Sequence, residues 1–229
     1  MSKNQIYLGQ TETSFDRKEI TGKLISFENE NYYKIDNSDA MRPFFMSIVS
    51  DSNHWMFISS NGGLSAGRKD SESSLFPYYT DDKITESADI TGSKTILQVR
   101  KSGKTFLWEP FSDRYAGIYK IHRNLYKNSF GNKVLFEEVN EDLGLTFRYQ
   151  WNSSNKFGFV RKSTLINNTS SKIETTILDG IQNILPYGVN EGLQNSRSNL
   201  VDAYKKCELE AEVGIGIYAL SAIIADKAE

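Results

Sequence analysis

The feature that most constrains the fold is an alternation of large apolar side chains with small or polar residues between positions 143 and 151. The alternate positions hold Leu143, Leu145, Phe147, Tyr149 and Trp151. Successive side chains of a β-strand point to opposite faces, so this pattern places all of these apolar groups on one face. The alternation predicts a strand with a buried face, and it places Trp151 in the core.

A returning strand is expected directly afterwards. The polar segment 152–155 supplies a turn, and Phe157, Phe159 and Leu165 fit a strand that pairs with the first. Similar short segments are expected to be strands at 23–27, 32–35, 44–49, 55–59, 95–99, 105–108, 118–125, 134–138 and 173–178. Short strands separated by Asn-, Asp-, Gly- and Ser-rich turns predict an all-β fold, a large antiparallel β-sandwich. A sandwich can include all 229 residues in a single domain.

The C-terminal region departs from this pattern. Apolar residues at helical spacing behind Ser198, an N-cap candidate, predict one short helix within Ser196–Glu208. The segment Val213–Ile224 is apolar on both faces and is expected to be a central strand, buried on both sides. A central strand so close to the end suggests that residues 1–229 are the N-terminal fragment of a longer multidomain enzyme.

Composition argues against several classes of partner and site. Lys and Arg total 27 against 29 Asp and Glu, without a basic run, so nucleic acid is not expected as a partner. No apolar stretch approaches the ~18 residues of a membrane span and no leader is visible, so a cytoplasmic location is predicted and no membrane contact. The lone Cys207 rules out an internal disulfide. The sequence predicts neither a metal nor a cofactor.

Catalytic residues are also not predicted. His54 and His122 are isolated in sequence and lack metal-binding spacing, so each is expected to pack or to hydrogen-bond rather than to catalyse. The acidic pairs Glu137–Glu138 and Glu141–Asp142 are expected to be solvated at strand ends and turns, because adjacent strand residues point to opposite faces. The sequence therefore predicts a module that is not catalytic by itself.

Candidate carbohydrate contacts are aromatic residues with planar polar groups nearby in sequence. Aromatic faces pack on the C–H surfaces of a sugar, and carboxylate, amide or guanidinium groups bind its hydroxyls. Trp108 ends a predicted strand and is placed among these candidates as a residue that can face solvent. The candidates are Trp55, Arg68, Tyr78, Tyr79, Asp81, Asp82, Trp108 and Arg114.

Three segments, Met41–Phe45, Trp55–Ser65 and Leu75–Ile84, resemble the N-terminal β-sandwich of the cellobiose and chitobiose phosphorylase-like family (glycoside hydrolase family 94-like, glycosyltransferase family 36-like). In that family a strand ending in a Ser/Asn-rich Gly-Gly turn precedes an aromatic and acidic segment, and Ser198–Glu229 suits the later part of the module. The glycine run is shortened here to Gly62–Gly63, and Leu64 stands where an aromatic residue is expected.

The resemblance implies a supersandwich, similar to galactose mutarotase, that is joined to a helical (α/α)₆ barrel. The barrel would hold the catalytic acid and the phosphate site, so no catalytic residue is carried onto this chain. The implied partners are an oligosaccharide, the C-terminal catalytic domain of the same polypeptide and a second copy in a homodimer. Two alternatives stay open: a free-standing carbohydrate-binding module, and an aldose-epimerase-like enzyme that would need a histidine and a carboxylate on one concave face.

Overall fold

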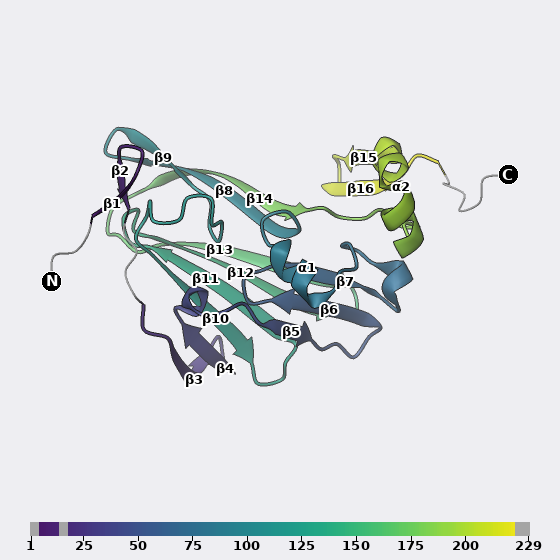
Figure 1. Cartoon of the computed structure of the whole chain (residues 1–229), viewed down its shortest axis with the longest axis horizontal. Helices are drawn as coiled ribbons and strands as arrows, with labels where there is room; N and C mark the ends of the chain where they lie inside the picture. The colour runs from purple at the N-terminus through teal and green to yellow at the C-terminus, as the bar shows by residue number, and fades with distance from the viewer. Residues whose placement is uncertain (1–4, 14–17, 223–229) are drawn as a thin grey trace.

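The computed structural model describes residues 5–13 and 18–222. Figure 1 shows an antiparallel β-structure with two layers in its central part, which confirms the all-β, sandwich-like prediction. One layer is a large sheet of order β13-β12-β11-β10-β4-β3. Its strands are β3 (Thr21–Phe27), β4 (Glu30–Asp36), β10 (Ile121–Asn128), β11 (Lys133–Asn140), β12 (Leu145–Ser154) and β13 (Gly158–Asn167).

Two three-stranded sheets face the large sheet. One has the order β5-β6-β7 and the other the order β14-β8-β9. Their strands are β5 (Phe45–Ile48), β6 (His54–Ser59), β7 (Leu64–Arg68), β8 (Gly92–Lys101), β9 (Lys104–Trp108) and β14 (Glu174–Gln182). The remaining elements are the hairpins β1 (Ile6–Leu8) with β2 (Thr11–Thr13) and β15 (Lys205–Glu210) with β16 (Ile215–Leu220), the 3₁₀ turns η1 (Ser38–Ala40) and η2 (Ser71–Ser73), and the helices α1 (Asp81–Glu86) and α2 (Glu191–Tyr204).

The main hydrophobic core lies between the large sheet and the two smaller sheets. The alternating side chains from Leu143 to Trp151 are all buried in it, as the sequence predicts. They pack with Met56 and Ile58 of β6 and with Leu97 of β8. The predicted β12–β13 hairpin is also present, but β12 continues to Ser154 and the turn falls at residues 155–157 rather than 152–155.

A second apolar cluster covers part of the outer face of the large sheet. Tyr32, Tyr126 and Leu135 are buried there, with Phe27 packed beside them. The β3–β4 turn reaches across this face, because Glu28 forms an ion pair of 3.2 Å with Lys162 of β13. The middle strand β11 is therefore buried on both faces, which an alternating pattern does not predict.

The C-terminal predictions are wrong in two respects. Helix α2 begins earlier than expected, after Asn190, whose side chain accepts a hydrogen bond from Leu193 N, and it is kinked at Arg197. The residues from Lys205 form β15 rather than a last helical turn. The expected central strand is β16, which pairs only with β15 among the described residues. Its Ile215 and Ile217 are exposed, because no element of residues 5–13 and 18–222 covers that face of the small hairpin. Residues 223 and 224 lie outside the described part.

Helix α1 is a further element that the strand pattern did not predict. It follows the aromatic segment at residues 75–79 and packs against β6 and β7. Within residues 5–13 and 18–222, no helix is long and apolar enough to cross a membrane.

Candidate functional site

Four aromatic rings lie in a row on the outer face of the β5-β6-β7 sheet, and we refer to Phe45, Phe57, Trp55 and Tyr78 as the aromatic row. The ring centroids of Phe45 and Phe57 are 5.3 Å apart, with planes inclined by 28°. Phe57 and Trp55 follow at 5.7 Å and 35°, and Tyr78 meets Trp55 edge-on at 5.8 Å and 79°. Phe45 and Phe57 are thus stacked, Trp55 is tilted relative to Phe57, and Tyr78 closes the row edge-on.

Strand alternation places this row outside the core. Met46, Met56 and Ile58 are buried against the large sheet, so their strand neighbours point the other way. Phe45 is 46% exposed and Tyr78 is 42% exposed, while Trp55 and Phe57 are partly exposed. Large aromatic groups gathered on a solvent-facing surface are a signature of a binding surface, because single exposed apolar residues are ordinary but clusters are not.

Gly67 makes room for the indole of Trp55. The two residues are directly opposite each other on β6 and β7, and a Cβ atom on Gly67 would lie 2.6 Å from Cζ2 of Trp55. Any other residue at this position would displace the ring from the strand. The same edge of the indole is held by a hydrogen bond, since Trp55 Nε1 donates to the carbonyl oxygen of Asp70 at 3.2 Å.

Residues 75–86 cover the rest of the same sheet face, and they include three other predicted sugar contacts, Tyr79, Asp81 and Asp82. Ser65 Oγ donates to the carbonyl oxygen of Pro77 at 2.9 Å, and Thr85 Oγ1 lies 3.3 Å from Ser59 Oγ. These contacts fix the chain just before and within α1. Tyr79 is half-buried in this segment, and Asp81 and Asp82 are exposed in the first turn of α1. Hydrogen bonds from the Thr80 hydroxyl and from the Lys83 backbone N–H lower the pKa of Asp82, which keeps it ionised.

The other predicted contacts lie elsewhere. Trp108 is 2% exposed, and its Nε1 donates a hydrogen bond of 2.7 Å to Glu138, so its placement as a solvent-facing candidate is wrong. The core closes over the end of β9, which the sequence does not reveal. Arg68 ends β7 opposite His54 and lines a separate groove of about 920 Å³ with Phe157 and Tyr187. Arg114 is exposed in the β9–β10 loop.

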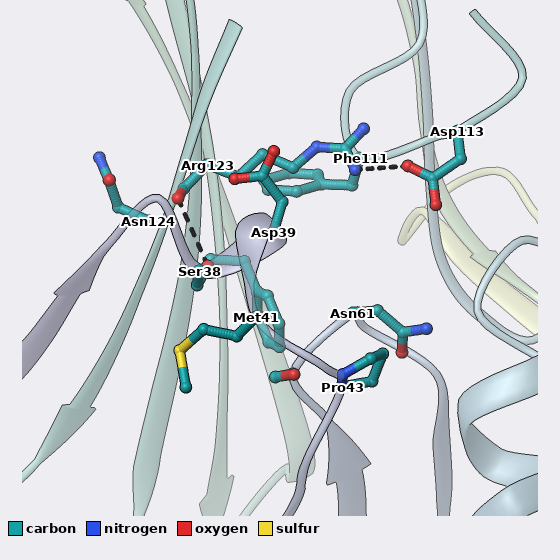
Figure 2. A pocket seen from close by; sticks show the side chains of 11 residues that line it. Ser38, Asp39, Met41, Pro43, Asn61, Phe111, Asp113, Arg123 and Asn124 are labelled. Carbon is teal, nitrogen blue, oxygen red and sulfur yellow. Dashed lines mark hydrogen bonds and ion pairs between the residues drawn. The ribbon is translucent and has the colours of Figure 1, made fainter. Parts of the chain in front are cut away.

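Figure 2 shows a smaller pocket of about 210 Å³ beside the core, where Arg123 reaches toward Asp113. It lies between η1, the β6–β7 turn, the β9–β10 loop and the large sheet. Its lining is Ser38, Asp39, Met41, Pro43, Ser60, Asn61, Phe111, Asp113, Arg123, Asn124 and Phe136.

Most polar groups of this pocket are already engaged within the protein. Arg123 donates to Asp113 at 2.6 Å and to Glu138 at 2.7 Å, and Asn61 Nδ2 donates to the Thr85 carbonyl at 2.9 Å. Burial by itself lowers the pKa of Arg123, but the carboxylates of Glu138 and Asp113 raise it above its ordinary value, so the guanidinium stays charged. The pocket therefore holds a structural ion network, and few of its donors are left for a ligand.

Glu137 and Glu138 correct another expectation, because both are buried rather than solvated. Glu138 accepts hydrogen bonds from Trp108 Nε1, Phe111 N and Arg123 Nε, each 2.7 Å long. The second acidic pair, Glu141–Asp142, is exposed as predicted. Buried carboxylates are retained when donors and cations surround them, and a single sequence does not show which donors from other strands will do so.

The two histidines line different depressions. His54 Nδ1 lies 2.8 Å from Ser52 Oγ, with its ring 5.0 Å from that of Phe159. Burial, and to a lesser degree Arg68, lower the pKa of His54. His122 Nε2 lies 2.7 Å from Glu141 on the outer surface. His122 lines a different groove, and His54 is not among the residues that line it. The two imidazoles thus share no site for general acid–base chemistry, and each has the hydrogen-bonded role expected of it.

Among the residues that the structure describes, no group of three or more His, Cys, Asp or Glu side chains is placed to hold a metal ion.

The sequence predicted Trp55 and Tyr78 as contacts but did not predict Phe45 and Phe57, the other members of the aromatic row. Phe57 is two residues after Trp55 in one predicted strand, which is the spacing of a shared face, so this signal could have identified it. No protein-family model matches this chain, and no curated protein matches it.

Proposed function

We propose that this chain is a non-catalytic β-sandwich module of a carbohydrate-active enzyme, similar to a glycoside phosphorylase or hydrolase, and that its aromatic row contacts an oligosaccharide. The observation that carries the proposal is the row itself, with ring centroids 5.3 to 5.8 Å apart on a solvent-facing sheet. Sugar rings present C–H faces that pack on aromatic rings, and their hydroxyls keep hydrogen bonds to water or to polar groups at the rim.

Polar groups are available at one end of the row. Tyr78 stands at that end and is followed within four residues by Asp81 and Asp82, both exposed. A carboxylate accepts hydrogen bonds from neighbouring hydroxyls, which suits a polyhydroxylated ligand better than an apolar one. The rings supply contact area, and the acidic end of the segment supplies orientation.

The chain offers a fluorescence probe for this site. Of the three tryptophans, Trp108 and Trp151 are 2% exposed, and only Trp55 is within reach of solvent. Titration with a panel of neutral β-linked oligosaccharides, up to millimolar concentration, is expected to change the emission of Trp55 and to shift the amide resonances of β5, β6 and residues 75–82. Absence of both changes and of any heat of binding would rule against sugar contact.

Substitutions test whether an oligosaccharide binds at the aromatic row or contacts any exposed aromatic ring non-specifically. We expect Trp55→Ala and Tyr78→Ala each to weaken binding by about tenfold, the effect of losing ~1.4 kcal/mol of aromatic contact. Phe130→Ala is the matched control, because Phe130 is 73% exposed in the β10–β11 turn and is not a member of the row. Equal weakening by all three substitutions would contradict a site at the row.

The second part of the proposal is support of a neighbouring catalytic domain. It is favoured by the C-terminal hairpin, where Leu209, Val213, Ile215 and Ile217 are exposed. Ile215 and Ile217 share one face of the hairpin, and Leu209, opposite Gly216, lies on the other, so exposed apolar groups are offered to a neighbouring domain on both faces. The test is the natural reading frame: a helical continuation of several hundred residues past Glu229 supports the docking role. A stop codon there would leave the free-standing carbohydrate-binding module, the alternative function, in its place.

A further inference from the structure

Strand β14 is an open edge of its sheet. It is nine residues long and pairs with β8 over its whole length, from Glu174 opposite Arg100 to Gln182 opposite Gly92. No other backbone pairing of β14 is found among the described residues. Figure 1 shows the strand along the upper rim of the molecule. Its outer backbone groups are thus available to another strand.

The other long edge strands carry cations that discourage strand addition. Lys23 lies on β3 and Lys162 on β13, with side chains 59% and 55% exposed. Charged side chains, especially Lys, together with Pro and bulges, are the usual protection of an edge. Strand β14 contains no Lys, Arg or Pro.

The two acidic residues of β14 are neutralised by neighbouring strands. Arg161 of β13 binds both carboxylate oxygens of Asp179 at 2.9 Å, and Arg100 of β8 forms an ion pair with Glu174. Burial alone raises the pKa of Asp179, but the hydrogen bonds from Arg161 and Thr95 lower it below its ordinary value. Because both carboxylates are paired with arginines, β14 presents little net charge to a strand that would pair with it.

Apolar side chains accompany this open backbone. Leu178, the central residue of β14, is 70% exposed, and Ile177 and Ile181 are also exposed. These side chains lie on both faces of the strand, since neighbouring residues alternate in direction. A strand placed beside β14 would cover apolar groups on both faces as well as the backbone.

We propose that the occupant of this edge is β14 of a second copy, paired antiparallel about a twofold axis at Leu178. In this register Glu174 lies opposite the partner's Gln182, Thr175 opposite Ile181, Thr176 opposite Gly180, and Ile177 opposite Asp179. No like charges face each other, and the two central leucines meet across the axis. The pairing is isologous and closes as a dimer, joining the two three-stranded sheets into one. It is independent of the sugar contact proposed above.

Cysteine crosslinking tests the register directly. In a Cys207→Ser background, which removes the exposed native thiol, Leu178→Cys places two thiols opposite each other at the axis. The Cα separation of facing antiparallel residues, ~4.5 to 5.5 Å, suits a disulfide. Mild oxidation is expected to give a covalent dimer at least tenfold faster than with Leu24→Cys in the same background. Leu24 is the matched control because it is 76% exposed on edge strand β3.

Light scattering supplies the second measurement. One strand pair forms a small interface, so we expect weak self-association of the full chain, with a Kd of about 10 μM to 1 mM, that Leu178→Lys abolishes and Leu24→Lys leaves intact. Circular dichroism verifies that both variants fold. A wild-type chain that stays monomeric up to millimolar concentration, or equal crosslinking rates at positions 178 and 24, would overturn the proposal.

Discussion

Glu137 and Glu138 are neighbours on β11, yet they lie in two different environments on opposite faces of the large sheet. Glu138 points into the main core, where its partner Arg123 has a side chain only 14% exposed. Glu137 points to the outer face, where it accepts hydrogen bonds from Asn124, Tyr126 and Arg148, and the Arg148 side chain is 25% exposed. Both carboxylates are buried and paired with an arginine, but the arginine beside Glu138 is the less exposed of the two.

The difference teaches that the cost of losing a buried carboxylate depends on what happens to its partner. Removing one member of a closed ion pair leaves a buried charge without compensation, whereas a partner near the surface can be hydrated. Arg148 also lies over the ring of Phe27, 5.2 Å from its centroid, which holds the guanidinium in place on the outer face. We therefore expect the loss of the outer carboxylate, Glu137, to lower the free energy of unfolding less than the loss of Glu138.

The largest effect is expected from Glu138→Gln. The substitution removes the charge beside Arg123 and leaves the amide to face three donors with one acceptor oxygen. We expect the free energy of unfolding to fall by about 3 to 5 kcal/mol. Urea denaturation with an unchanged m-value would measure this, with Glu208→Gln, an exposed carboxylate on β15, as the control. A loss below ~1 kcal/mol would contradict a closed core network.

Glu137→Gln is expected to cost less, about 1.5 to 3 kcal/mol, the range for hydrogen bonds to charged groups. The same urea titration compares the two variants directly. Equal losses from both substitutions would show that the outer face is as closed as the core, and the comparison above would fail.

Acid titration is expected to distinguish Glu137 further. Burial alone raises the pKa of Glu137, but hydrogen bonds from Asn124 and Tyr126 and the charge of Arg148 lower it below its ordinary value of 4.5. A carboxyl group with a lowered pKa stabilises the folded state above its unfolded pKa and loses this contribution as the pH falls through its folded pKa. The difference in unfolding free energy between wild type and Glu137→Gln should therefore be constant near pH 7 and shrink below pH 4.5. A difference that does not change with pH would contradict the ionised state of Glu137.

The smallest effect is expected for the contact between Phe27 and Arg148, which Phe27→Leu tests by removing the ring beneath the guanidinium. The cation–π contact should contribute about 0.5 to 1 kcal/mol, separate from the contacts of the ring with Tyr32 and Tyr126. A double-mutant cycle with Glu137→Gln measures the coupling, and we expect a coupling energy different from zero because both residues hold one guanidinium. Strict additivity would show that Phe27 does not position Arg148.

Much of the architecture can be predicted from local pattern. The alternation from Leu143 to Trp151 identified strand β12 of the large sheet and a buried tryptophan, because side-chain direction in a strand depends only on sequence position. Helix α2 was detected but misplaced, since its start depends on the Asn190 cap and its end on the pairing of Lys205 with Leu220. Long-range pairing overrides helical spacing in such cases.

The candidate site was predictable only in part. Trp55 and Tyr78 could be proposed from residue type, yet their contact depends on the segment that folds back across β6 and β7, and on the absence of a side chain at Gly67. Trp108 has the same residue type and a similar place at a strand end, but the core closes over it. Residue type indicates the chemistry of a side chain, whereas exposure depends on what the rest of the chain places above it.

The sequence by itself determined that this protein is built from antiparallel strands, which residues of β12 face the core, and which residue types could contact a sugar. Only the tertiary structure decided that β11 is buried on both faces, that two adjacent glutamates pair with arginines of neighbouring strands, and that the aromatic row faces solvent. The physical reason is range: strand direction follows from adjacent residues, whereas burial and charge pairing follow from contacts between strands far apart in sequence.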